Sequence, residues 1–292
     1  MKIAISSLPK KPWWSDGIIG YKDNPFMKNG TVPNQNLLIK ERLNLIATLK
    51  KNKIEVIEFP FPKILEESKF GHDYVFMRDS FISDLNGNVL MLKFAEKKRE
   101  AETEIVANEL EKLNFNLKEL PTKKNILAEG GEFYYCSGQK ILFSGACRNN
   151  IRGAEWVAQE FNVNELVILK SNVFHLDTLF TPVIDKKNKL RGVVACTELM
   201  EKDSKIQLKD FTNRFGIDLV EVDVEDSIGT DQALGEFAVN CCPLPGYLIG
   251  PTRFRSLEVN QLLSKLDVMH ITVPTTQFRL SGGSVHCLTN EL

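Results

Sequence analysis

The chain lacks the cysteine spacing of a metal site or a disulfide framework. None of its six cysteines forms a Cys-x-x-Cys pair, and most lie in apolar, strand-like runs. They are Cys136, Cys147, Cys196, Cys241, Cys242 and Cys287. Structural zinc and a disulfide framework are therefore not expected, and a reducing cytoplasm is the simplest location.

Long apolar runs and an excess of one charge are also missing. No run of about eighteen apolar residues occurs, so no membrane-spanning segment is expected. The stretch Met1–Pro9 lacks the apolar core of a signal peptide. The formal net charge is −1, which gives no electrostatic reason to expect nucleic acid or a membrane surface as a partner.

What is present is an ordinary globular composition. Of 292 residues, 43% are hydrophobic and 26% are charged, enough to bury a substantial core. The length allows one large domain or two, and we expect a single domain over residues 1–292. A long loop over residues 9–35 is expected to form a lid or a pocket wall, because aromatic residues such as Trp13 and Phe26 favour packing over disorder.

A hairpin, a helix and a strand recur along the chain. The alternation of apolar residues and the turn residues between them predict two short strands, an amphipathic helix and a third strand in each repeat. Complete repeats are predicted over residues 74–120, 132–169, 174–222 and 234–273. The two ends of the chain can complete a fifth. This pattern predicts an α/β fold of five ββαβ-like units around a pseudo-fivefold axis, a propeller.

Polar residues fall at matching places in these repeats. The first repeat carries Arg78-Asp79 in an apolar strand, the second opens with Glu129-Gly-Gly-Glu132, the third carries His175-Leu-Asp177, and the closing stretch carries Cys287. Each group lies in or just before the first strand of its repeat. Equivalent positions in a ring converge on its axis, so these groups are expected to meet.

The closing stretch favours a reactive thiol at Cys287. The preceding Gly282 and Gly283 let the backbone turn tightly and approach a neighbour closely. Such a thiol is a nucleophile if a histidine reaches it. On a strand, His286 would point to the opposite face, so the base is expected elsewhere. The alternative is a cysteine packed as a small hydrophobe.

Each of the other groups also has a structural alternative. Asp79 could pair with Arg78, Gly130-Gly131 could be a turn between two solvated glutamates, and His175 could be a core histidine. Taken together, however, several carboxylates, a histidine and a cysteine at matching positions favour function. Buried carboxylates are costly unless they meet a cation, so the cluster predicts a cationic ligand.

Five motifs, taken in order, resemble the guanidine-modifying penteins. They are Phe76-Met-Arg-Asp79, Glu129-Gly-Gly-Glu132, Arg148-Asn-Asn-Ile-Arg-Gly-Ala-Glu155, His175-Leu-Asp-Thr178 and Gly282-Gly-Ser-Val-His-Cys-Leu-Thr289. This family includes dimethylargininases, arginine deiminases and glycine-type amidinotransferases. The resemblance runs from about Asp73 to the last residue and implies the pentein-type α/β propeller.

The resemblance implies catalytic roles for three residues. Cys287 would attack the guanidinium carbon of an arginine-like substrate and form a covalent thiouronium intermediate. His175 would protonate the leaving amine and then activate water. Glu129 would support His175 and the guanidinium. No metal and no other cofactor is implied.

The same resemblance implies substrate-binding roles for five more residues. Asp79 and Asp177 would bind the guanidinium nitrogens through charge-assisted hydrogen bonds. Arg152, which matches an Arg-Gly-Ala-Glu of dimethylargininases, would hold the substrate carboxylate. Asp73 and Arg99 would be further substrate contacts.

Departures from the family patterns leave the substrate open. Dimethylargininases usually carry Glu-Asp where this chain has Arg78-Asp79, as arginine deiminases do, yet the chain is too short for the extra helical module of typical deiminases. The segment Asn24-Pro-Phe-Met27 is similar to the Asn-Pro-Trp-Met of arginine dihydrolases. Those tend to carry Asn in place of Asp79, which argues against a double hydrolysis.

The sequence thus predicts a cytoplasmic hydrolase that converts arginine or a methylated arginine to citrulline and an amine or ammonia. The first alternative is an amidinotransferase, in which an amine replaces water. A non-catalytic pentein that acts as a binding module is a further alternative, although the complete Cys–His–carboxylate set argues against it. The expected partner is a small guanidino compound, not nucleic acid or a membrane, and a homodimer is one of the oligomeric states left open.

Overall fold

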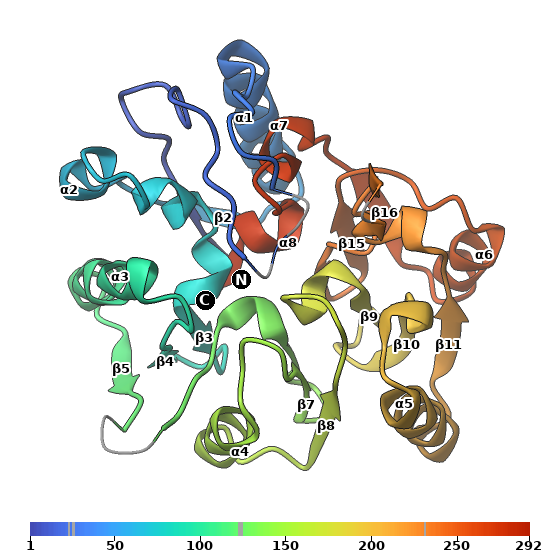
Figure 1. Cartoon of the computed structure of the whole chain (residues 1–292). Coiled ribbons are helices and arrows are strands. Elements are labelled where there is room, and N and C mark those ends of the chain that lie inside the picture. Colours follow the sequence, from blue (N-terminus) through green and yellow to red (C-terminus); the bar gives the residue numbers. More distant parts are fainter. Residues whose placement is uncertain (23, 25–26, 122–124, 231) are drawn as a thin grey trace. The chain divides into compact units, whose positions relative to one another are not determined.

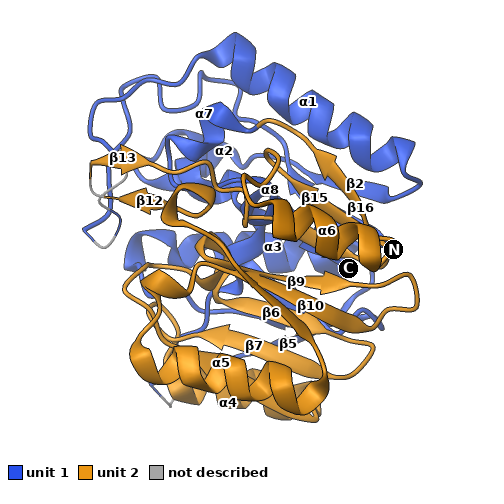
Figure 2. Cartoon of the chain, turned by 90° about the vertical axis from the view of Figure 1, so that its right-hand side faces the viewer, with its two compact units in different colours: residues 1–130, 275–292 blue, residues 131–274 orange. Residues whose placement is uncertain are grey.

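The structure is a computed structural model that describes residues 1–22, 24, 27–121, 125–230 and 232–292. The chain forms two compact units, coloured separately in Figure 2. The first comprises Met1–Gly130 and Thr275–Leu292, and the second comprises Gly131–Pro274. The single domain over residues 1–292 stays a prediction.

In its described part, the first unit contains two sheets of one design (Figure 1). An antiparallel pair is joined by a parallel third strand that follows a helix in the sequence. One sheet consists of β17 (Asn290–Glu291), β1 (Lys2–Ser6) and β2 (Glu55–Phe59), with α1 (Gln35–Lys51) before β2. The other consists of β3 (Phe81–Ser83), β4 (Asn88–Met91) and β5 (Asn116–Glu119), with α3 (Glu100–Lys112) before β5.

Short helices complete the first unit. They are α2 (Lys63–Glu66), α7 (Thr276–Arg279), α8 (Val285–Leu288) and the 3-10 turns η1 (Gly71–Val75), η2 (Met77–Ser80) and η3 (Lys97–Arg99). The carboxylate of Glu41 on α1 accepts hydrogen bonds from the backbone N–H groups of Thr276 and Gln277, so α1 and α7 lie side by side (Figure 1). Phe59, Phe81 and neighbouring apolar side chains fill the core between the sheets and α3.

The described part of the second unit repeats the same design in three sheets. They are β6 (Phe133–Cys136), β7 (Ile141–Gly145) and β8 (Glu165–Leu169); β9 (Phe180–Ile184), β10 (Leu190–Ala195) and β11 (Asp218–Glu221); and β14 (Cys242–Leu244), β15 (Tyr247–Gly250) and β16 (Met269–Thr272). The helices before the third strands are α4 (Ile151–Glu160), α5 (Lys202–Phe215) and α6 (Leu257–Lys265).

The remaining elements are short. β12 (Gly229–Thr230) and β13 (Ala233–Leu234) form a two-stranded ribbon, and the 3-10 turns are η4 (Gly130–Glu132), η5 (Leu176–Thr178), η6 (Thr197–Leu199) and η7 (Val224–Asp226). The core of the second unit contains an aromatic cluster: the ring of Phe143 lies 4.8 Å from that of Phe180 and 5.2 Å from that of Phe211, centroid to centroid. Such tilted and edge-on contacts suit the quadrupoles of aromatic rings.

The predicted α/β class and hairpin–helix–strand repeat are confirmed in every sheet of three strands within the described residues, including the one built from both chain ends. The arrangement of these sheets around a fivefold axis stays a prediction. One hairpin is misplaced in the prediction: the repeat expected to begin at residue 234 has its first strand, β14, only from Cys242.

Two of the predicted first strands begin later than expected, because side chains hold the preceding backbone in turns. The Nδ2 group of Asn290 donates to the carbonyl oxygens of Met77, Arg78 and Phe81, so residues 77–80 form η2 and not a strand. The hydroxyl of Thr178 donates to the carbonyl oxygen of His175 at 2.7 Å, which closes η5.

No helix in the described part of the chain is both long and apolar enough to cross a membrane. The cytoplasmic location stays a prediction.

Candidate active site

The predicted site residues lie in turns just before the first strand of each repeat. Asp79 lies in η2 before β3, Glu129 precedes η4 and β6, His175 precedes η5 and β9, and Cys287 lies in α8 before β17. All four side chains are buried. Their predicted position relative to the strands is confirmed, but the strand geometry expected for three of them is wrong.

Arg99 is the centre of a buried charge network in the first unit. Its guanidinium donates from Nη1 to Asp79 Oδ2 at 2.6 Å, and from Nε and Nη2 to the two oxygens of Glu102 at 2.9 and 2.8 Å. Nη2 also donates to the backbone carbonyl of Asp73 at 3.2 Å, and the group lies over the Phe94 ring. Its bonds in the structure therefore point to neighbouring protein groups, and its predicted contact with substrate stays a prediction.

Burial governs the electrostatics of this network. Burial raises the pKa of Glu102 to about 7, against the opposing charge of Arg99. It also raises the pKa of the Asp73 carboxyl group, again opposed by Arg99. The pKa of Arg99 is held well above its usual value, since the charges of Glu102 and Asp79 outweigh the effect of burial. The guanidinium is therefore permanently charged.

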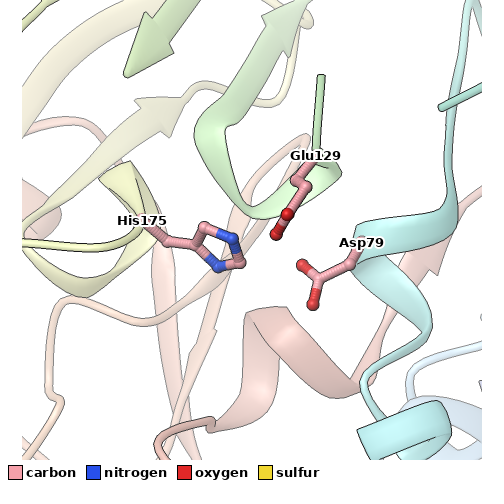
Figure 3. Close-up of side chains that lie close together, drawn as sticks. All are labelled: Asp79, Glu129 and His175. Atoms are coloured by element: carbon pink, nitrogen blue, oxygen red, sulfur yellow. The ribbon is translucent and has the colours of Figure 1, made fainter. Parts of the chain in front are cut away.

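Asp79 and Glu129 form a close carboxylate pair. One oxygen of each lies within 4.8 Å of the other, and the two groups point toward one another (Figure 3). The carboxylate of Glu129 accepts the backbone N–H of Ala95 at 2.7 Å, and its side chain is 0% exposed. Such a pair can bind a cation, whether a guanidinium or a metal ion.

The segment that carries Cys287 is clamped to η2. Arg78 donates from Nε to the carbonyl of His286 at 3.4 Å and from Nη1 to Asn290 Oδ1 at 3.2 Å, and it forms an ion pair with Glu291 at 2.6 Å. These bonds and those of Asn290 hold α8 against the turn that carries Asp79. Arg78 and Asp79 each form an ion pair with a residue far away in the sequence, Glu291 and Arg99 respectively.

The two glycines before Cys287 approach neighbours closely, as predicted. Gly282 has φ +83°, and a Cβ atom there would overlap the side-chain amide of Asn24. A Cβ atom on Gly283 would overlap the ring of Phe76. A side chain at either position would therefore force the segment away from these groups.

Asp73 links the long N-terminal loop to the same region. Its carboxylate accepts the hydroxyl of Ser281 at 2.9 Å and a hydrogen bond from Tyr21. In the same loop, the buried ring of Trp13 packs on Phe76 and Phe278. The expected packing of this loop is confirmed for its described part; Phe26 and Pro25 lie outside the described residues, and the role of a lid stays a prediction.

In the second unit, His175 and Asp177 flank the start of η5. The imidazole of His175, labelled in Figure 3, is 2% exposed and lies 5.1 Å from the Phe174 ring, centroid to centroid. Asp177 is 0% exposed, and its backbone carbonyl accepts Asn240 Nδ2 at 2.9 Å. The two side chains do not alternate along a strand, since His175 is extended and Asp177 lies in the 3-10 turn.

The two arginines of the fourth-helix motif differ in burial. Arg152 lies on the first turn of α4 and is exposed, whereas Arg148 is 5% exposed and its guanidinium lies 5.0 Å from the centroid of the Phe174 ring. Phe174 precedes His175. The family resemblance implies a role for Arg152 alone; the signal for Arg148 is its place just before the helix-capping residue Asn150.

The structure excludes one alternative and one argument. The alternative of two solvated glutamates around Gly130-Gly131 is excluded, because Glu129 and Glu132 are 0% and 1% exposed. Cys287 and His286 lie on a helix, where neighbours are about 100° apart, so the strand argument against His286 as the base does not hold. The assignment of the base to His175 stays a prediction.

The family comparison covers nearly the whole chain. The model of a family described as N,N dimethylarginine dimethylhydrolase, eukaryotic, matches residues 21–292. The chain belongs to this family. Its resemblance to guanidine-modifying penteins is thereby confirmed. A search of curated proteins gives no match.

Solved structures share the fold of this dimethylarginine dimethylhydrolase family member. The N-terminal domain of ArgZ bound to product, an arginine dihydrolase from the ornithine–ammonia cycle in cyanobacteria, has a TM-score of 0.79 at 21% identity, over 99% of this chain and 96% of that one. A dimethylarginine dimethylaminohydrolase adduct with 4-chloro-2-hydroxymethylpyridine has a TM-score of 0.71 at 15% identity, over 100% and 99%. The complex of AgrE with ornithine and NAD+ has a TM-score of 0.78 at 19% identity. The match covers 99% of this chain but only 39% of AgrE.

Proposed function

We propose that the protein hydrolyses the guanidinium group of free arginine or a methylated arginine to give citrulline and ammonia or an amine. The observation that best supports this proposal is the buried cluster of carboxyl groups in the first unit. Asp73, Asp79 and Glu102 surround the single guanidinium of Arg99, and Glu129 lies beside Asp79. The cluster holds more carboxyl groups than cationic side chains, which favours a cationic ligand. Family membership supports a guanidinium as that cation.

In this proposal the Cys287 thiolate attacks the guanidinium carbon. The positive charge of the substrate favours the thiolate over the thiol. The C–N bond breaks after His175 donates a proton to the leaving nitrogen, which departs as ammonia or amine. The remaining thiouronium is attacked by water, whose proton passes to His175. The C–S bond then breaks to give citrulline and the free thiol, so one water is consumed per turnover.

The remaining roles follow from the same proposal. Asp79 and Asp177 bind guanidinium nitrogens, and Glu129 supports His175. For the substrate carboxylate, the burial of Arg148 beside Phe174 favours this residue, while the exposed Arg152 stays a second candidate. Asp73 and Arg99 act as further substrate contacts or as supports of Asp79.

The direct test is a turnover assay with arginine, methylated arginines and agmatine, with and without an amine acceptor, followed by mass spectrometry. Cys287→Ser is expected to abolish all turnover while the fold is retained. Cys136→Ala is the matched control, because Cys136 is also a buried thiol, whose pKa is raised by burial. Full turnover by Cys287→Ser would refute the nucleophile, and an amidino product on the acceptor amine would favour transfer over hydrolysis.

A second experiment assigns the carboxylate partner. Arg148→Ala should raise KM for arginine at least about tenfold, the effect of losing one charge-assisted bond, and should change KM for agmatine little, because agmatine lacks the carboxylate. Arg152→Ala is the comparison. The larger selective effect identifies the partner, and equal effects on both substrates would exclude the variant's residue from that role.

Double hydrolysis of arginine to ornithine is the second candidate function. It is favoured by Asn24, a buried residue of the dihydrolase-like loop that lies against Gly282, five residues before Cys287. Asp79, where dihydrolases tend to carry Asn, opposes it. Ornithine with two ammonia per arginine, formed without an amine acceptor, would establish this function, and citrulline as the end product would exclude it.

A further inference from the structure

Glu132 has no role in the proposed mechanism, although it closes the Glu129-Gly-Gly-Glu132 motif. It ends η4 immediately before β6 and is 1% exposed. A buried carboxylate in this position needs hydrogen-bond donors. In the second unit those donors come from backbone N–H groups of two separate segments.

The first segment lies just before α4. Oε1 of Glu132 accepts the backbone N–H of Cys147 at 2.9 Å, of Arg148 at 2.7 Å and of Asn149 at 3.4 Å. Three successive N–H groups directed at one oxygen form an anion-binding concavity. Its middle residue is Arg148, the favoured partner of the substrate carboxylate.

The second segment begins at His175. Oε2 of Glu132 accepts the backbone N–H of Leu176 at 2.9 Å, and this N–H belongs to the peptide that joins Leu176 to His175. The carboxylate thus fixes the peptide plane next to the proposed acid and base. His175 and Glu132 also interact electrostatically. Burial raises the pKa of Glu132, and the charge of His175 opposes that rise.

The absence of a side chain at Gly145 makes space for this carboxylate. A Cβ atom on Gly145, the last residue of β7, would overlap Oε2 of Glu132 and crowd its carboxyl carbon. Gly145 therefore has a specific reason to lack a side chain: the end of β7 must admit the carboxylate that bonds Leu176. The surroundings of the Glu132 carboxylate therefore come from three parts of the second unit: residue 145, residues 147–149 and residue 176.

We propose that Glu132 is a positioning residue, which sets the orientation of His175 and the place of Arg148 by bonding both backbone segments through one carboxylate. The inference rests on the proposed function, since it assumes that His175 and Arg148 act on the substrate. A carboxylate that only stabilised the fold would affect neither the imidazole nor turnover by the folded protein.

The test compares Glu132→Gln with Asp226→Asn in the full-length chain. Asp226 is a matched control: it is 2% exposed, lies in the same unit and accepts the backbone N–H of Arg255 through both oxygens at 3.1 Å. The two readouts are kcat and KM for arginine, and the NMR resonances of the His175 imidazole. These are assigned among the four histidines by their loss in His175→Gln.

Glu132→Gln should lower kcat by about 10- to 100-fold, since a displacement of about 1 Å in a catalytic group has effects of this size, and should shift the His175 resonances. Asp226→Asn should leave both within about twofold of wild type at a similar loss of stability. Unshifted His175 resonances and kcat within twofold in Glu132→Gln would overturn the proposal, as would equal effects of Asp226→Asn.

Folding of each variant is checked first by circular dichroism. If Glu132→Gln does not fold, Glu132→Asp replaces it, because it keeps the charge but shortens the reach by one methylene; the same two readouts then decide. If the wild-type protein hydrolyses no guanidine, the proposed function fails by itself. The imidazole resonances still show in that case whether Glu132 orients His175.

Discussion

Two sets of buried carboxyl groups, one in each unit, are compensated in different ways. In the first, Asp79 and Glu102 share the guanidinium of Arg99, so one side chain compensates several charges. In the second, Glu132 accepts backbone N–H groups from two separate segments, and Asp226 accepts the backbone N–H of Arg255. Backbone donors survive almost any substitution, whereas a single arginine does not. The first arrangement should therefore be the more fragile one.

The difference also separates two kinds of positioning. A side-chain cation tunes the charge of its neighbours, as the raised pKa of Arg99 and its opposing effect on Glu102 indicate. Backbone donors instead join segments, as Glu132 joins residues 147–149 to Leu176. Under the proposed function, Asp79 of the first unit would bind the substrate cation, and Glu132 of the second would position His175 and Arg148.

The largest expected effect comes from removing the shared cation. Arg99→Met leaves Asp79 and Glu102 buried without their guanidinium and should lower the free energy of unfolding by about 3–5 kcal/mol. Urea denaturation measures this loss. Arg42→Met is the control: its ion pair with Glu58 is partly exposed and should contribute less than about 1 kcal/mol. Equal losses in the two variants would remove the distinction between the networks.

A smaller effect is expected when a carboxylate of the second unit is neutralised. Asp226→Asn replaces a charged acceptor of the Arg255 N–H and should cost about 2 kcal/mol in the free energy of unfolding. Asp218→Asn, which weakens an exposed pair with Lys265, should cost less than about 1 kcal/mol. If Asp226→Asn lowered the free energy of unfolding as much as Arg99→Met does, the carboxylates held by backbone N–H groups would be as sensitive to substitution as those held by a cation.

Much of the fold could be predicted, because alternating apolar residues and turn residues indicate the strands and hairpins of each repeat. The predicted repeats end at residues 120, 169, 222 and 273, and β5, β8, β11 and β16 end within one residue of these positions. The turns at η2 and η5 could not, because their apolar residues match a strand pattern. Long-range bonds from Asn290 and a local bond from Thr178 decide the conformation there.

The candidate site could be predicted as a set of residues but not as a set of contacts. Equivalent repeat positions identified Asp79, Glu129 and Cys287 as buried groups. Nothing in the sequence near Arg99 indicates that Glu102 and Asp79 bind it, since these partners are set by how η2, η3 and α3 pack. The sequence also could not separate Arg148 from Arg152, because only the fold decides which of the two is buried.

The smallest expected effect concerns two histidines, one in each unit, and the stability that each contributes as the pH falls. Burial lowers the pKa of His270 on β16 to about 4, and the charge of Arg253 adds to this effect. Burial also lowers the pKa of His72, but the charge of Asp73 opposes it. Both groups take up protons more readily when unfolded. The stability each contributes is therefore present above pH of about 6.5 and is lost as pH falls toward the folded pKa.

His270 should dominate this acid loss. At pH of about 5.5, about one unit below its unfolded pKa of about 6.5, it should account for at most about 1.4 kcal/mol of lost stability, because the unfolded chain binds the proton there and the folded chain, with a pKa of about 4, does not. His270→Gln should flatten the decline in urea midpoint between about pH 7 and 5, and His72→Gln should flatten it less. A larger effect of His72→Gln would mean that the carboxylates of the first unit do not offset burial, contrary to the charge-rich environment inferred there.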